Sequence, residues 1–230
     1  MARLPRLVLP GVALHIIQRG NNRMACFRED SDRFVYLMHL KELAAKTQCS
    51  IHAYCLMGNH VHLLMTPSSV SGCISLMRDL GQRYVQYFNR HHGRTGTLWE
   101  GRFRSCLVES PTYVLACYRY IELNPVRAAM VESPHEHRWS SHAVNTGRRA
   151  DAFIEPHQDF RALGGCLEYA RLFPEELSME LLATIRDAVS GGYPLCSDAF
   201  RERIAADSER PVQRSKGGRP SKVAAAETGL

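Results

Sequence analysis

The chain has 230 residues, of which 45% are hydrophobic, and this is enough for one sizeable domain or for one domain with an appended subdomain. No apolar run approaches the roughly 20 residues that a membrane-spanning helix needs, and the N-terminus lacks the long apolar segment of a signal peptide. The eight cysteines form no Cys-x-x-Cys pair, so we expect reduced thiols in a cytoplasmic protein that has no membrane partner.

The net charge of +6 is spread unevenly along the chain. Residues 1–150 carry 19 Lys and Arg against 10 Asp and Glu, residues 151–200 carry 3 against 9, and residues 201–230 carry 7 against 4. All but two of the basic residues in the first segment are arginines, whose planar guanidinium suits bidentate contact with phosphate. This distribution favours nucleic acid as the partner, although a well-solvated basic surface is the alternative.

In the first half of the chain, predicted strands alternate with predicted helices. A strand over 13–19 ends at Gly20-Asn21-Asn22, and a turn at Gly58-Asn59 joins strands over 51–57 and 60–66. Helical spacing of apolar residues, caps and prolines predicts helices over 30–46, 71–91 and 111–123, and a second hairpin joins short strands over 97–99 and 103–109. This order predicts an α+β fold, with helices packed on one face of an antiparallel sheet.

The periodic pattern weakens beyond about residue 133. Helices near 166–172, 174–189 and 197–206 predict a small acidic appendage over 146–209. Residues 210–230 are polar and contain Gly and Pro, which is typical of a disordered basic tail. We therefore expect one domain over 1–145, followed by the helical appendage and the tail.

Two histidines in the strand over 60–66 carry the first chemical signal. His60 and His62 are separated by one residue, so their side chains point to the same face of the strand, roughly 6–7 Å apart along the backbone. A rigid element that aims two imidazoles at one point can hold a metal ion, although a pair of hydrogen-bonded sheet histidines is the alternative.

The helix over 111–123 offers a second signal. Tyr120 and Asn124 are four residues apart, so a phenol and an amide oxygen stack about 6 Å apart along the helix axis. Tyr118 and Glu122 have the same spacing, but Tyr118 falls on the apolar arc of the helix, where a core tyrosine belongs. If the face of Tyr120 meets the histidines, His60, His62 and Asn124 become candidate metal ligands beside a tyrosine.

Four sequence blocks follow one another along the chain: Gln18-Arg19-Gly20-Asn21-Asn22-Arg23, Gly58-Asn59-His60-Val61-His62-Leu63-Leu64, Gly96-Thr97-Leu98-Trp99-Glu100-Gly101-Arg102-Phe103 and Tyr118-Arg119-Tyr120-Ile121-Glu122-Leu123-Asn124-Pro125-Val126-Arg127. In this order the blocks closely resemble the single-tyrosine HUH transposases and, among them, the REP-associated tyrosine transposases. The resemblance covers about residues 5–145 and implies a ferredoxin-like or RRM-like HUH domain. It implies that His60 and His62 are metal ligands, that Tyr120 is the nucleophile, and that Asn124 supplies the third ligand, where other branches have Gln.

The resemblance also implies an activity. It implies a metal-dependent endonuclease and strand transferase that cuts single-stranded DNA at hairpin-forming repeats through a 5′-phosphotyrosine and can rejoin the strand. Mg²⁺ or Mn²⁺ would be the metal, and a monomer is favoured over a dimer. A tyrosine of ordinary pKa near 10 is only about one part in a thousand ionised at pH 7, and the sequence indicates no clear base for Tyr120.

We expect DNA contacts from two segments of the chain. The first is the loop after the strand over 13–19 and the second is the segment near residue 100, where arginines alternate with aromatic residues in a pattern that suits single-stranded DNA. The predicted contacts are Arg19, Asn21, Asn22, Arg23, Trp99, Arg102, Phe103 and Arg104. Core packing is an equal alternative for the two aromatic rings.

Two other classes of protein remain open. A nucleic-acid-binding module without catalysis would be expected to have lost at least one of His60, His62, Tyr120 and Asn124. A zinc-dependent hydrolase would be expected to have a third histidine or a carboxylate motif, and none stands out in the sequence.

Overall fold

The computed structural model describes residues 6–207 and 212–213, so the predicted tail over 210–230 lies outside the described residues except for residues 212 and 213. Four antiparallel strands form one sheet in the order β2-β3-β1-β4. The strands are β1 (Ala13–Arg19), β2 (Cys49–Leu56), β3 (His60–Pro67) and β4 (Arg104–Val108). The α+β class and the antiparallel sheet are confirmed.

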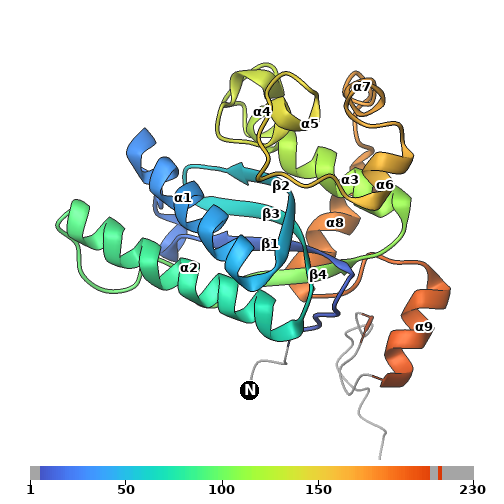
Figure 1. The fold of residues 1–230 in the computed structure, drawn as a ribbon, viewed down its shortest axis with the longest axis horizontal. Helices are drawn as coiled ribbons and strands as arrows, with labels where there is room; N and C mark the ends of the chain where they lie inside the picture. Colours follow the sequence, from blue (N-terminus) through green and yellow to red (C-terminus); the bar gives the residue numbers. More distant parts are fainter. Residues whose placement is uncertain (1–5, 208–211, 214–230) are drawn as a thin grey trace, which may run out of the picture.

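Two long helices cover one face of the sheet, α1 (Asp30–Thr47) and α2 (Val70–His91), and they lie side by side (Figure 1). Their buried side chains, such as Tyr36, Leu40 and Tyr84, share one core with the strand residues of that face, among them Ile16 and Leu63. Burial of this apolar surface is the main force that holds the two helices to the sheet.

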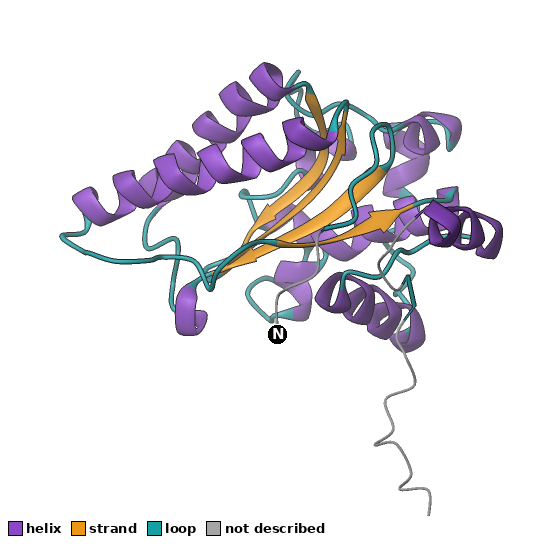
Figure 2. Ribbon diagram, turned by 90° about the horizontal axis from the view of Figure 1, so that it is seen from below, coloured by secondary structure: helices purple, strands orange, loops and turns teal. Residues whose placement is uncertain are grey.

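The opposite face of the sheet is also covered, which corrects the expectation that helices pack on one face only (Figure 2). Helices α3 (Pro111–Glu122) and α8 (Met179–Gly191) pack there. The physical reason is that the alternate residues of the strands, for example Ala53, Leu64 and Cys106, are apolar as well. A sheet that is apolar on both faces must be covered on both faces.

The remaining elements connect or extend these two layers. They are η1 (Asn21–Arg23), α4 (Asn124–Arg127), η2 (Pro134–Glu136), α5 (His142–Asn145), α6 (Gln158–Ala162), α7 (Cys166–Ala170) and α9 (Asp198–Asp207). Phe160, Tyr169 and Ile185 of the predicted appendage share a core with Tyr118 of α3. The predicted boundaries at residues 145 and 209 stay predictions. No helix within the described residues is long and apolar enough to cross a membrane.

The second predicted hairpin is not formed. Trp99 makes an isolated bridge to Gly20 rather than a strand, and β4 pairs with β1 instead of with residues 97–99. The backbone groups of this segment bond to the end of β1, where Asn21 N–H donates to Leu98 C=O and Glu100 N–H donates to Arg19 C=O. These bonds give the backbone N–H and C=O groups of this segment partners without a second strand.

Candidate active site

A cleft of about 360 Å³ lies on the face of the sheet that α3 and α8 cover. Its lining side chains come from β1, β3, α3, α4 and α8, which are far apart in the sequence. The lining residues are Ile17, Arg19, Met57, His60, His62, Tyr120, Asn124, Arg127, Ala128, Arg186, Val189 and Ser190. The predicted convergence of the His-x-His pair with Tyr120 and Asn124 is therefore found in the structure.

The hydrogen bonds of His60 set which of its nitrogens is free. Asn59 donates from Nδ2 to the Arg23 carbonyl at 3.1 Å, which turns its Oδ1 toward His60 Nδ1 at 2.6 Å. Because an amide oxygen only accepts, His60 Nδ1 carries the proton and donates it. The lone pair of His60 is therefore on Nε2, the state that a metal ligand requires.

A third histidine supports His62. His15 of β1 is fully buried, and its Nε2 lies 3.0 Å from His62 Nδ1. The two residues are diagonal neighbours across the β1–β3 pair, in which Ile17 lies opposite His62 and His15 lies opposite Leu64. Because the hydrogen bond uses Nδ1 of His62, it leaves His62 Nε2 available to a ligand. It also engages His15 Nε2, so this nitrogen is not a free third ligand.

Burial keeps these imidazoles neutral. It lowers the pKa of His60 to about 4, with a smaller effect from the charge of Arg19. Burial also lowers the pKa of His15 to about 3, with Arg127 contributing, and moves the pKa of His62 well below its usual value of 6.5. At pH 7 the cleft therefore presents neutral imidazoles with unshared electron pairs.

Tyr120 near the end of α3 and Asn124 at the start of α4 line the cleft together with the histidines. The ring centroid of Tyr120 lies 5.5 Å from that of His15 and 5.8 Å from that of His62. Asn124 donates from Nδ2 to the carbonyls of Tyr120 at 3.0 Å and Ile121 at 3.3 Å. These two bonds cap the helix and fix the orientation of the amide, so Oδ1 is the atom left to accept or to ligate.

The side chains fit a divalent ion. Two neutral imidazoles and one amide oxygen form a mixed donor set, and each of these side chains makes a hydrogen bond through its other polar atom, which leaves Nε2 of both rings and Oδ1 of Asn124 facing a ligand. Such outer partners orient metal ligands in proteins generally. An amide oxygen beside two imidazoles is a donor set that divalent metal ions accept.

The predicted DNA contacts divide into two groups. Arg19, Arg102 and Arg104 line a second, smaller cavity, which shares Ile17, Arg19 and Ser190 with the main cleft. Asn21, Asn22 and Arg23 form η1, whose last carbonyl holds Asn59.

Trp99 and Phe103 lie in the hydrophobic core, where they are 7% and 9% exposed. Trp99 packs against Tyr84, and the guanidinium of Arg6 covers the Phe103 ring at 3.7 Å. Neither ring offers a free face to a base, and we leave both out of the DNA-binding surface.

The competing pair, Tyr118 and Glu122, lies in a different place. Tyr118 is fully buried, and its hydroxyl accepts a hydrogen bond from the His157 backbone N–H at 3.0 Å. Glu122 accepts from Ser141 Oγ at 2.6 Å and from Tyr169 Oη at 2.9 Å. Both residues therefore have structural partners, and neither lines the cleft.

Sequence reasoning missed His15, which lies behind His62, and two arginines that line the cleft, Arg127 and Arg186. A single histidine at the centre of the apolar strand over 13–19 was a usable signal for His15, because a buried polar side chain needs a partner. Arg127 closes the last of the four motif blocks, whereas Arg186 lies in an otherwise acidic segment and carries no signal.

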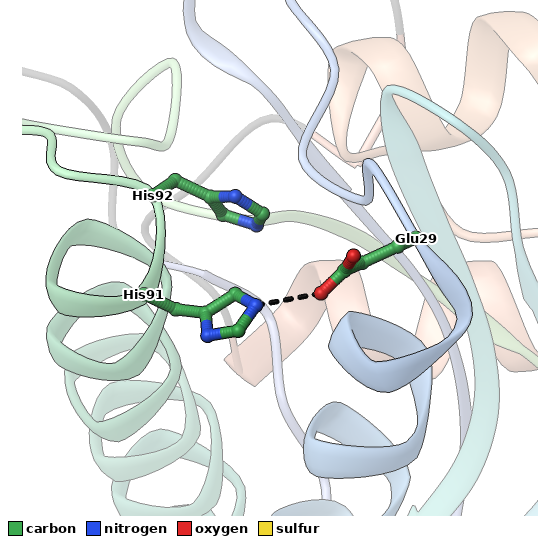
Figure 3. Close-up of side chains that lie close together, drawn as sticks. All are labelled: Glu29, His91 and His92. Atoms are coloured by element: carbon green, nitrogen blue, oxygen red, sulfur yellow. Dashed lines mark hydrogen bonds and ion pairs between the residues drawn. The ribbon is translucent and has the colours of Figure 1, made fainter.

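A second cluster of ligand-type side chains lies where α1 begins and α2 ends, on the other face of the sheet (Figure 3). Ligand atoms of Glu29, His91 and His92 lie within 4.8 Å of one another, the only such group of three His, Cys, Asp or Glu among the described residues. His91 Nε2 lies 2.6 Å from Glu29 Oε1, and His92 Nε2 lies 2.9 Å from Asp32 Oδ1. These contacts join the end of α2 to the beginning of α1.

Comparison with known proteins gives a family match and a fold match. The family described as "Transposase IS200 like" matches residues 9–124. A REP-associated tyrosine transposase, solved bound to a REP hairpin, is 15% identical with a TM-score of 0.52, over 69% of this chain and 93% of that chain.

A crystal structure from Deinococcus radiodurans R1 is 19% identical over 50% of this chain and 92% of that chain, with a TM-score of 0.37 that is too low to support an argument. No curated protein matches the chain.

Proposed function

Because the chain belongs to the IS200-like transposase family, we propose that it cuts and rejoins single-stranded DNA with Tyr120 as the nucleophile. The observation that supports this most directly is the cleft itself, which Tyr120 of α3 and Asn124 of α4 line together with two neutral imidazoles of β3. The proposed substrate is single-stranded DNA with hairpin-forming, REP-like repeats, by analogy with the hairpin bound to the protein of similar fold.

His60, His62 and Asn124 are the proposed ligands of Mg²⁺ or Mn²⁺. Asn59 sets the tautomer of His60, the contact with His15 orients the ring of His62, and the carbonyls at the end of α3 orient the amide of Asn124. A bound divalent ion would neutralise charge on the non-bridging oxygens of the scissile phosphate.

The proposed reaction is an exchange of one phosphodiester for another. Tyr120 Oη forms a bond to phosphorus, the bond from phosphorus to the 3′-oxygen breaks, and the phenol proton is transferred in net terms to that 3′-oxygen. The products are a 5′-phosphotyrosine and a free 3′-OH. Attack by a 3′-OH reverses these steps and rejoins a strand without a nucleotide cofactor.

A basic surface leads to the cleft and provides the proposed path for the strand. Arg102 and Arg104 line the smaller cavity next to it, and Arg19 lines both cavities. Asn21, Asn22 and Arg23 of η1 follow Arg19 closely in the chain and are the further proposed contacts. Arginines can neutralise successive phosphates of a single strand along this path.

The test is covalent capture of a labelled hairpin oligonucleotide in Mn²⁺, resolved on a denaturing protein gel. Because the phosphotyrosine holds the DNA on the 3′ side of the cut, we expect a 3′ label to stay on the protein and a 5′ label to be released. We expect EDTA and Tyr120→Phe each to abolish the labelled protein band.

Tyr118→Phe is the matched control, because it removes a hydroxyl from the same helix outside the cleft. This variant should keep the adduct. Retained DNA binding with no adduct in the wild-type protein would instead indicate a binding module, and cleavage that survives Tyr120→Phe would indicate a hydrolase that uses water.

A further inference from the structure

The candidate cleft contains positive charge without a matching acid. Arg19, Arg127 and Arg186 line it, and none of the described Asp or Glu residues does. Among the described residues, neither Arg127 nor Arg186 forms an ion pair within 4.0 Å. A guanidinium removed from water without a counter-charge is costly, so such a site favours an anion.

Arg127 is fixed beside the proposed nucleophile. Its Nη2 donates to the carbonyl of Tyr120, and its guanidinium carbon lies 4.4 Å from the centroid of the Tyr120 ring. Its other terminal nitrogen, Nη1, is buried and has no hydrogen-bond partner among the residues that the structure describes. The capping bond therefore uses one end of the guanidinium fork and leaves the other end free for a ligand.

Arg186 approaches the same space from a different layer. It lies on α8, is exposed, and lines the cleft together with Ser190. Burial is the main cause of the lowered pKa of Arg127, and the nearby charge of Arg186 lowers it further. Two like charges that face one cleft repel each other, and a bound anion between them would relieve that repulsion.

We propose that Arg127 and Arg186 form a two-arginine clamp on the phosphate that Tyr120 attacks, and that the clamp holds this phosphate while it is attached to the tyrosine. The inference rests on the proposed function and extends it to residues beyond 124, where the family match ends. Guanidinium groups match the geometry of phosphate oxygens and place two fixed charges where negative charge grows during transfer.

The clamp gives the C-terminal region a role in the reaction. Residues 151–200 carry a net negative charge. Arg186 of α8 is one of their few basic residues, and it lines the cleft. The arginines move no proton in this scheme, so the proton of Tyr120 follows the path already described.

The experiment compares two substrates in single-turnover adduct formation. One hairpin oligonucleotide carries the natural scissile phosphodiester, and the other carries an uncharged methylphosphonate at that position. We expect Arg127→Met to slow adduct formation with the natural substrate by about 10²-fold, as for the loss of one charge-stabilising donor. The preference for the charged substrate should also fall by at least about tenfold, because the variant has lost the guanidinium that interacts with the charge of the phosphate.

Arg119→Met is the matched control. Arg119 lies on α3, is partly buried like Arg127 and also donates to a backbone carbonyl, that of Glu175, but it does not line the cleft. It should keep the wild-type preference between the two substrates. Arg186→Met changes an exposed side chain that should not affect folding, and we expect it to reduce the preference to a smaller degree than Arg127→Met.

A second measurement separates this inference from the proposed function. Inorganic phosphate is titrated into the wild-type protein and the variants in EDTA, with calorimetry as the readout. We expect Arg127→Met to lose phosphate binding and Arg119→Met to keep it, even if the wild-type protein forms no DNA adduct. Equal phosphate binding by the wild-type protein and Arg127→Met, or an unchanged substrate preference in that variant, would overturn the clamp.

Discussion

His15 Nε2 and His62 Nδ1 lie 3.0 Å apart in the buried interior of the sheet, and this contact determines how His62 can act. If His62 presents Nε2 to an ion, its proton must be on Nδ1 and must be donated to His15 Nε2. The proton of His15 then lies on its own Nδ1, which has no partner in the structure. The tautomer in which His62 presents Nε2 to an ion therefore leaves the Nδ1–H of His15 unpaired in the core.

Replacement of His15 should weaken metal binding without touching a ligand. We expect His15→Phe to lower the affinity for Mn²⁺ by about 10- to 100-fold, because a ligand loses the partner that orients it. His15→Gln, whose amide oxygen can accept from His62, should recover part of this loss. Free Mn²⁺ is measured by electron paramagnetic resonance, and His52→Gln serves as the control because His52 is also buried in the sheet but bonds to Thr66 and Glu155. Equal affinity in His15→Phe and wild type would contradict the prediction.

Asn59 should control the tautomer of His60. In Asn59→Ala, Nδ1 of His60 loses its acceptor, so the ring can place its proton on Nε2 and we expect a several-fold loss of Mn²⁺ affinity. Asn59→Asp keeps an acceptor oxygen and should retain most of the affinity. The ¹⁵N shifts of the His60 ring report the tautomer directly. An unchanged Nδ1-protonated ring in Asn59→Ala would show that the amide is not the determinant.

Stability should fall as the pH drops through the range in which the unfolded histidines titrate. The pKa values of His15, His52 and His60 are lowered to between about 3 and about 4, mainly by burial, against a usual value of 6.5. Below pH 6.5 the unfolded chain binds protons that the folded protein does not, so the free energy of unfolding decreases with falling pH. The decrease continues until the pH reaches the folded values near 4.

Urea unfolding in EDTA between pH 7.5 and 4.5 measures this effect. We expect the midpoint to decrease steadily below pH 6.5 in the wild-type protein and less steeply in His52→Gln, which has one fewer buried imidazole to titrate. A midpoint that does not change across this range would contradict neutral burial of these histidines.

Local sequence patterns predicted those features of the site that depend on a single strand or on a single helical stretch. His60 and His62 share a face because of strand alternation, and Tyr120 and Asn124 stack because of helical periodicity. The order of strands and helices was also readable from turns and caps. Their boundaries fall close to the predicted ones, as for α2 over 70–91.

Parts that depend on which elements become neighbours could not be read from the sequence. His15 contacts His62 only because β1 lies beside β3, and Arg186 reaches the cleft only because α8 packs on β1 and β4. Trp99 could equally have been exposed or buried, because no local periodicity marks the segment near residue 100. Its burial follows from a bridge to Gly20 at the end of β1.

Glu122 should matter for stability and not for the reaction. Its buried carboxyl group accepts hydrogen bonds from Ser141, Asn145 and Tyr169, which joins α3 to the segments that follow it. In Glu122→Gln an amide NH₂ group replaces one carboxylate oxygen. Because this NH₂ group can only donate, it leaves some of these donors without an acceptor, and we expect the free energy of unfolding to fall by about 2–4 kcal/mol. Glu168→Gln, which removes one partner of a surface ion pair with Arg171, should change it by less than about 1 kcal/mol.

Urea unfolding and the covalent capture assay, run on the same preparation, distinguish the two roles of Glu122. The variant should unfold at lower urea, yet the yield of Tyr120 adduct per folded molecule should stay close to that of the wild type. This follows because Glu122 does not line the cleft. A fully folded Glu122→Gln protein that forms no adduct would instead support the pair Tyr118 and Glu122 as part of the reaction. Wild-type stability in the variant would show that the buried hydrogen bonds contribute little.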